Sequence, residues 1–153
     1  MSPTTASPSN INLSYADTED EIRACFAVMR ELRPHLASAQ ELADRVALQK
    51  RSGYRLLAGR DAAERVVACA GFRVTENLMH GRHLYVDDLV TLESERARGH
   101  GERLFRFLVD AARAAGCEKV VLDTGLSNAL AHRFYYRQGM LATALRFTLP
   151  LSL

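Results

Sequence analysis

The sequence lacks the features that mark several specialised classes of protein. It contains no apolar segment long enough to cross a bilayer and no Lys- or Arg-rich run. Its formal net charge of +2 is too small to indicate a partner as acidic as nucleic acid. We therefore expect neither a membrane nor a nucleic acid as a partner, and the hydrophobic and charged fractions of 48% and 25% are typical of a globular protein.

Cysteine and histidine are also too few and too scattered for a metal site or a disulfide framework. Cys25, Cys69 and Cys117 are odd in number, far apart and in apolar surroundings, and no C-x-x-C pair occurs. The five histidines are dispersed along the chain. We expect buried, reduced thiols in a cytoplasmic protein, and no metal.

The beginning of the chain lacks the basic and apolar regions of a secretion signal. Met1–Asn10 is rich in Ser, Thr and Pro, which predicts a disordered leader. The rest, residues 11–153, contains no linker and no internal repeat, so we expect a single domain there.

The chain does contain clear helix and strand patterns. Thr18 and Ser38 each begin a capping box, and the helices that follow are expected to end at Pro34 and Gly53. Further helices are predicted over Glu102–Ala115, followed by the C′ glycine Gly116, and from Ser127 or Asn128 to Arg137 or Gln138. Strands are predicted at Ile11–Ala16, Tyr54–Ala58, Arg65–Thr75, His83–Leu92, Lys119–Thr124 and Met140–Leu149.

This order of elements predicts a mixed α/β sheet, antiparallel at first and then continued by a βαβ crossover. Gly71, inside the third strand, suggests a bulge or close packing. The last stretch, Met140–Leu149, alternates in character and is also suited to pair with a second copy in a homodimer.

The turn Arg96–Gly101 lies between a β-branched run and a helical run. Such a turn leaves backbone N–H groups unpaired at the start of a helix, where the helix dipole favours an anion such as phosphate. The alternative is an ordinary solvated helix start. No Gly-Lys-Ser/Thr follows, so it is not a Walker A loop, and Leu104 occupies the third glycine position of a dinucleotide fingerprint.

Two motifs make the chain resemble the GNAT (GCN5-related N-acetyltransferase) family. The first is Arg96-Ala97-Arg98-Gly99-His100-Gly101, which is similar to the family's Gln/Arg-x-x-Gly-x-Gly/Ala motif. The second is Asn128 followed by Ala131-x-x-Phe134-Tyr135-x-x-x-Gly139, where Met140 replaces the family's Phe. The resemblance covers Ile11–Leu149 and implies an α/β (α+β) fold, with a mixed central sheet of about six or seven strands flanked by about four helices.

The resemblance also implies acetyl-CoA as co-substrate. The strand at Leu89–Thr91 is expected to pair with the pantetheine amides, the turn to bind the pyrophosphate, and Asn128 to hydrogen-bond the pantetheine arm. Arg103 is a further candidate for a cofactor phosphate. The residues expected to bind the cofactor are Leu89, Val90, Thr91, Arg96, Ala97, Arg98, Gly99, His100, Gly101, Glu102, Asn128 and Tyr135.

Acetyl transfer to an amine needs a base for the amine and an acid for the departing thiolate. Tyr135, which the resemblance places beside the sulfur, is the expected acid, because a phenol with a pKa of about 10 stays protonated at neutral pH. The alternative is that Tyr135 only packs against Phe134.

Three aspartates are candidates for the base. Asp87 and Asp88 are adjacent on one strand, so alternation places them on opposite faces and only one is expected to face a cleft. Asp88 shares its face with apolar residues and is expected to be partly buried and bonded to backbone or to an arginine. Asp123 on the next strand is the third candidate. The alternative for all three is substrate binding or a structural hydrogen bond.

Two functions remain open. The first is an N-acetyltransferase acting on a primary amine of a small molecule or peptide; the second is a non-catalytic acyl-CoA-binding sensor or regulatory module. His83 and His132 are expected to be structural rather than catalytic. Several basic residues occur near the expected acceptor region: Arg30, Arg33, His35, Arg73 and Arg82. They favour an acceptor with a carboxylate or phosphate, although solvated surface arginines explain them equally well.

Overall fold

The protein is described from a computed structural model that covers residues 9–152, so most of the expected leader lies outside the described residues. The chain divides into two compact units, one ending at Val121 and the other beginning at Leu122, and each is described by itself. The strands are β1 (Asn12–Tyr15), β2 (Arg55–Arg60), β3 (Val66–Asn77), β4 (Gly81–Thr91) and β5 (Lys119–Leu122). The helices are α1 (Glu19–Arg23), α2 (Phe26–Leu32), α3 (Ala39–Lys50), α4 (His100–Ala114) and α5 (Ala129–Arg137), with a 3₁₀ turn at Glu93–Glu95.

The first unit is built on a sheet whose strands lie in the order β1-β2-β3-β4-β5. The first four strands pair antiparallel with their neighbours in sequence. Helix α4 connects β4 to β5, as a crossover connection requires. The predicted mixed α+β class is confirmed.

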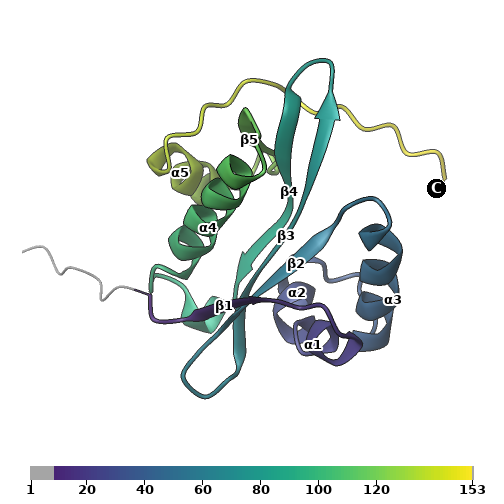
Figure 1. Ribbon diagram of the computed structural model, residues 1–153, viewed down its shortest axis with the longest axis vertical. Helices are drawn as coiled ribbons and strands as arrows, with labels where there is room; N and C mark the ends of the chain where they lie inside the picture. Colours follow the sequence, from purple (N-terminus) through teal and green to yellow (C-terminus); the bar gives the residue numbers. More distant parts are fainter. Residues whose placement is uncertain (1–8, 153) are drawn as a thin grey trace, which may run out of the picture. The chain divides into compact units, whose positions relative to one another are not determined.

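Helices cover both faces of this sheet (Figure 1). Helices α1 to α3 pack on one face, where Val28, Leu42 and Val46 join Leu56 and other strand residues in a buried core. Helix α4 lies on the other face and buries its stripe of Leu104, Phe105 and Leu108. Each such buried side chain contributes about 1.5–3 kcal/mol, so packing holds the strands that carry the candidate site residues.

The helix starts follow the predicted caps. The Thr18 side chain accepts from the Glu21 amide, and the Glu21 side chain bonds back to the Thr18 amide, so the first capping box is confirmed. Ser38 caps α3 in the same way, but the Glu41 carboxylate accepts from the Ala37 amide instead of completing the box. Asn128 caps α5 through a bond from the Ala131 amide.

The helix predicted between Thr18 and Pro34 is interrupted at Ala24 and Cys25 and forms α1 and α2. The Cys25 thiol donates to the Glu21 carbonyl at 3.4 Å, while the Cys25 amide donates to the Ile22 carbonyl instead. In a continuous helix the Cys25 amide would donate to the Glu21 carbonyl. Here the thiol uses that carbonyl, and the chain forms a tighter turn at this point. This break explains why five α-helices are described where about four were expected.

The strand predicted at Met140–Leu149 is wrong. Residues 140–150 belong to no helix or strand, and Leu145, Phe147 and Leu149 are exposed. Alternation of side chains predicts an extended backbone, but a strand also needs a neighbour to bond. The described residues therefore form five strands, fewer than the six or seven expected, and the homodimer inferred from this stretch stays a prediction.

Cys25 and Cys69 are buried as expected, whereas Cys117 is only half-buried, and all three are free thiols. The two buried sulfurs lie together in the core and share a hydrogen bond, which lowers the pKa of Cys25 and, with burial, raises that of Cys69 well above its usual range. Within residues 9–152, no helix combines the length and hydropathy that a membrane span requires.

Candidate functional site

A bulge between β3 and β4 shapes the part of the site that carries the two adjacent aspartates. Gly71 lies opposite Asp88 and Phe72 lies opposite Val86, so Asp87 is the extra residue on β4. The bulge suggested by Gly71 is confirmed. It also corrects the expected alternation, because an extra residue shifts the phase of the side chains, and both carboxylates bond to groups on the α1–α3 side.

Asp88 is the more enclosed of the two carboxylates. The Tyr54 hydroxyl donates to its Oδ2 at 2.8 Å, and Nε of Arg33 donates to its Oδ1 at 3.0 Å. Its side chain is only 11% exposed. Burial and the charge of Asp88 raise the pKa of Tyr54 well above its usual range, so this phenol remains a donor. The expectation that Asp88 is partly buried and bonded to an arginine is confirmed.

Glycine is required at position 71 because this bond passes beside it. A Cβ there would lie 1.9 Å from the Tyr54 hydroxyl and 2.5 Å from Asp88 Oδ2. Both distances are too short for non-bonded atoms. The bulge and the Tyr54–Asp88 bond therefore depend on the same glycine.

Asp87 keeps more freedom to accept a proton. Nε of Arg73 donates to its Oδ2 at 3.0 Å, and Arg73 is itself held by Ser52 and Gln49. Among the described residues, Oδ1 of Asp87 has no hydrogen-bond partner. Burial raises the pKa of Asp87 and Arg73 opposes that rise. A carboxylate with one open oxygen and a raised pKa is suited to act as a base.

The turn before α4 has the backbone form of an anion site. Ala97 has φ = 62° and Gly99 has φ = 79°, so two residues adopt the left-handed conformation. Gly99 occupies the N-cap position of α4, and no side chain caps that end. The first amides of α4 and the positive end of its dipole are therefore available to a negatively charged group.

The side chains of the turn are anchored by a buried glutamate. Glu95 pairs with Arg65 at 2.7 Å and with Arg98 at 3.0 Å. His100 is 5% exposed and bonds through Nδ1 to Ser9 at 2.8 Å, so its side chain is held within the protein. Arg98 is 63% exposed, so its guanidinium is accessible to a phosphate.

A cavity of about 720 Å³ adjoins this turn. It is lined by Ser9, Asn10, Asp61, Ala62, Ala63, Arg65, Glu95, Ala97, Arg98 and His100.

The expected pantetheine-binding stretch, Leu89–Thr91, lies at the end of β4. One side of this stretch pairs with Ala68–Ala70 of β3. On the other side, β5 begins beside the start of β4, where the Glu118 amide donates to the Arg82 carbonyl at 2.8 Å. Because β5 is only four residues long, its ladder ends before Leu89. The backbone of Leu89–Thr91 thus extends past the end of β5.

The second unit carries the remaining predicted residues. Asn128 uses its Oδ1 to cap α5, and its side-chain nitrogen has no partner among the described residues. Tyr135 lies on α5, half-buried, with its ring 5.4 Å from that of Phe134 in an edge-to-face contact. Burial raises the pKa of Tyr135, so the phenol stays protonated at neutral pH. Its expected acid role and its alternative packing role are compatible.

Asp123 is less available than the aspartates of β4. It accepts a hydrogen bond from Arg146 and forms an ion pair with it. Nε2 of His132 lies 2.8 Å from the Gly125 carbonyl, which is consistent with a structural role. His83 is buried, and its Nδ1 lies 2.9 Å from the Gly81 carbonyl.

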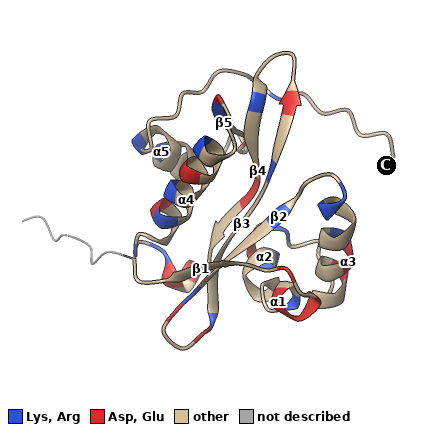
Figure 2. Cartoon of the chain, in the orientation of Figure 1, with Lys and Arg blue, Asp and Glu red and all other residues tan. Residues whose placement is uncertain are grey.

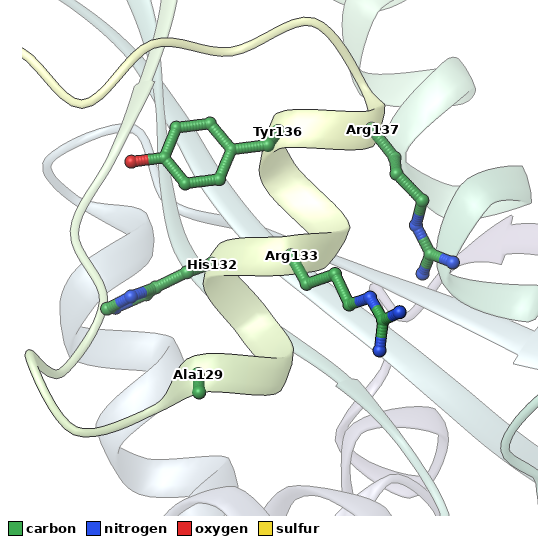
Figure 3. Close-up of a pocket in the computed structure, with 5 residues that line it drawn as sticks. All are labelled: Ala129, His132, Arg133, Tyr136 and Arg137. Atoms are coloured by element: carbon green, nitrogen blue, oxygen red, sulfur yellow. The ribbon is translucent and has the colours of Figure 1, made fainter.

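A shallow hollow of about 500 Å³ lies on the surface of α5 (Figure 3). His132 and Tyr136 project to one side of it, and Arg133 and Arg137 to the other. Neither Tyr135 nor Asn128 lines this hollow. No group of three or more His, Cys, Asp or Glu suited to a metal ion occurs within residues 9–152.

Sequence reasoning missed the role of Tyr54. A tyrosine that opens a strand looks like an ordinary core residue, and its partner Asp88 is 34 positions away. The sequence shows Arg33 and Arg73 only as members of a group of basic residues. Nothing local in the sequence indicates that each pairs with an aspartate. The signal that could have led to them is Gly71, since a glycine within a strand implies that something approaches it closely.

Comparisons with known proteins show the family of this chain. Residues 16–140 match the family described as "Acetyltransferase (GNAT) family". The chain is 33% identical over 126 residues to the uncharacterized N-acetyltransferase YhdJ of Bacillus subtilis, covering 82% of this chain and 87% of that protein. It is 32% identical over 140 residues to aminoalkylphosphonate N-acetyltransferase of Salmonella typhimurium, covering 89% and 88%.

The solved structures show the same fold. A structure of AAC(6')-Iy in complex with the bisubstrate analogue CoA-S-monomethyl-acetylneamine superposes with a TM-score of 0.79. The match covers 95% of this chain and all of that one at 14% identity, so it supports the fold alone.

Proposed function

Because the chain belongs to the acetyltransferase (GNAT) family, we propose that it transfers the acetyl group of acetyl-CoA directly to a primary amine of a small molecule. The observation that carries this proposal is the uncapped start of α4 behind two left-handed residues. That arrangement fits a pyrophosphate, and the aspartate pair lies on the strand that leads into it. The Salmonella relative is named for a small amine, which supports a small acceptor.

Acetyl-CoA supplies the acyl group when it is bound, and the residues present fit it. Amides of Ala97–Glu102 would hold the pyrophosphate, and the accessible guanidinium of Arg98 would donate to a phosphate oxygen. The backbone of Leu89–Thr91 would hydrogen-bond the pantetheine amides. The side-chain nitrogen of Asn128 would donate to the same arm.

Two side chains move protons in the proposed reaction. A carbon–nitrogen bond forms to the acceptor while the carbon–sulfur bond of the thioester breaks. Asp87 takes the proton that the amine loses, directly or through a water, because its Oδ1 is open. Tyr135 donates its phenolic proton to the departing thiolate and regains a proton from solvent.

The experiment is a calorimetric titration with acetyl-CoA, with ATP and NAD as comparisons, followed by mass spectrometry of a panel of primary amines. Saturable binding of acetyl-CoA alone, together with an acetylated amine, supports the proposal. Tight binding with no acetylated amine in the panel would favour the non-catalytic sensor instead. No binding of acetyl-CoA would contradict both functions.

The location is also proposed, as the cytoplasm. Three free thiols are typical of a reducing compartment.

A further inference from the structure

We infer that the acceptor carries an anionic group, a carboxylate or a phosphonate, near its amine, and that Arg33 binds this group. This inference rests on the proposed function. It assigns a specificity-determining residue to the same site and narrows the acceptor to a zwitterion.

Arg33 stands where it can contact both the protein and a ligand. It follows the last turn of α2 and reaches β4, where Nε donates to Asp88 Oδ1 at 3.0 Å and Nη2 donates to the Asp87 carbonyl at 2.7 Å. Nη1 has no partner among the described residues, and the side chain is 42% exposed. One edge of the guanidinium is therefore fixed by protein acceptors while the other faces solvent.

A guanidinium held in this way is suited to bind an anion. Its orientation is set before the ligand arrives, so little side-chain entropy is lost on binding. Its outer N–H groups lie in one plane and match two oxygens of a carboxylate or phosphonate. A loosely held surface arginine would lack this preorganisation.

The contact with Asp87 places Arg33 close to the proposed base. Nη2 of Arg33 touches the carbonyl oxygen of Asp87, and the proposed base is the carboxylate of that same residue. Arg33 therefore contacts the same residue whose carboxylate is the proposed base. An acceptor that contacts both needs its anion and its amine close together, as in an α-amino acid or an aminomethylphosphonate.

The other basic residues of the region are less suited to this role. Arg73 uses each of its three nitrogens, on Asp87, Ser52 and Gln49, whereas Arg33 keeps Nη1 without a partner among the described residues. Arg82 donates to the Ala115 carbonyl near the start of β4.

Charge balance favours a zwitterion over a simple cation. Arg33 is paired with Asp88 and Arg73 with Asp87, so each aspartate already has a counter-ion. Arg30, exposed three residues before Arg33, adds a further positive charge. Figure 2 shows acidic and basic residues interspersed over the helices and strands of this unit.

The test compares kcat/KM for three acceptors: aminomethylphosphonate, glycine and the neutral-tailed ethylamine. Wild type is expected to prefer an anionic acceptor over ethylamine by roughly 10- to 100-fold, as expected for one charge-assisted contact. The higher kcat/KM of the two anionic acceptors, aminomethylphosphonate or glycine, identifies the preferred anion. Arg33→Gln is expected to lose that preference mainly through KM, and Arg33→Lys to recover part of it. Arg45→Gln, an exposed arginine paired with Glu41 on α3, is the matched control and should keep it.

The outcomes separate this inference from the proposed function. If Arg33→Gln lowers kcat/KM equally for anionic and neutral acceptors, Arg33 only supports Asp88. That result would overturn the inference and leave the proposed acetyl transfer intact. A wild type that prefers ethylamine would overturn it too. If wild type acetylates no amine while binding acetyl-CoA, the proposed function itself fails.

Discussion

At the scale of single residues, two adjacent carboxylates have different environments. Asp88 is bonded by Tyr54 and Arg33 and is shielded from solvent, whereas Asp87 has one engaged and one open oxygen. The open oxygen of Asp87 can accept a proton. Burial raises the pKa of Asp87 toward the range where a base is useful. We therefore assign the base to Asp87 and a positioning role to Asp88.

The pH profile tests that assignment. Asp87 must be ionised to act, so kcat/KM should fall as the pH drops through its raised pKa. Arg73 holds this pKa down, so Arg73→Gln should move the acidic limb to higher pH. Asp87→Asn should remove the limb and lower kcat/KM by about 10²- to 10⁴-fold. Arg45→Gln serves as the control, and an acidic limb that stays in place or moves to lower pH in Arg73→Gln contradicts the assignment.

The role of Tyr135 is tested by removing its hydroxyl. Tyr135→Phe should lower kcat by about 10²-fold, because no proton reaches the thiolate, while acetyl-CoA still binds. Since burial raises the pKa of Tyr135, wild type should lose no activity from its ionisation below about pH 10. Tyr136→Phe alters the exposed neighbour and should have little effect. Unchanged kcat in Tyr135→Phe at every pH would leave only the packing role.

At the scale of elements, the β3–β4 bulge organises the aspartate pair. It inserts Asp87 as an extra residue and turns both carboxylates toward α1–α3. The bulge needs Gly71, because the Tyr54 hydroxyl occupies the space of a side chain there. The lack of a side chain at Gly71 thus sets the orientation of Asp87 and Asp88.

Replacing that glycine should damage both stability and activity. Gly71→Ala forces Tyr54 away from Asp88, and overpacking of this kind typically costs about 1–3 kcal/mol of unfolding free energy. Urea unfolding measures the loss, and kcat/KM should fall with it. Gly125→Ala is the control, because a Cβ there meets nothing within 4 Å. A Gly71→Ala variant that unfolds and reacts like wild type would contradict the proposed dependence on the bulge.

The sequence predicts a helix start or a bulge well where a residue within that element causes it. The capping residues Thr18 and Asn128 mark their helix starts, and Gly71 marks the bulge. The orientation of Asp87 was mispredicted, because alternation holds only in a regular strand and the bulge shifts it. The strand at Met140–Leu149 was mispredicted because pairing depends on a neighbour that no local pattern specifies.

At the scale of the whole molecule, the family match spans residues 16–140 and so includes parts of both compact units. The turn and the aspartate pair belong to the first unit, and Asn128 and Tyr135 to the second. A co-substrate that binds the folded chain and not the unfolded one should stabilise the fold.

Thermal unfolding measures that stabilisation. Acetyl-CoA at about 100 times its Kd should add about 2.7 kcal/mol to the unfolding free energy. For a chain of this length that is a rise in Tm of roughly 5–10 °C. ATP at the same concentration should give a much smaller rise. An equal rise with ATP would mean that the chain recognises only a nucleotide phosphate.

We propose that this chain catalyses amine-dependent cleavage of acetyl-CoA with Asp87 as base. The most direct test is the rate of free thiol release from acetyl-CoA, with and without an amine, in wild type and in Asp87→Asn. Wild type should release thiol only when an amine is present, and Asp87→Asn should lose this release. Release that ignores the amine, or that persists in Asp87→Asn, would contradict the proposal.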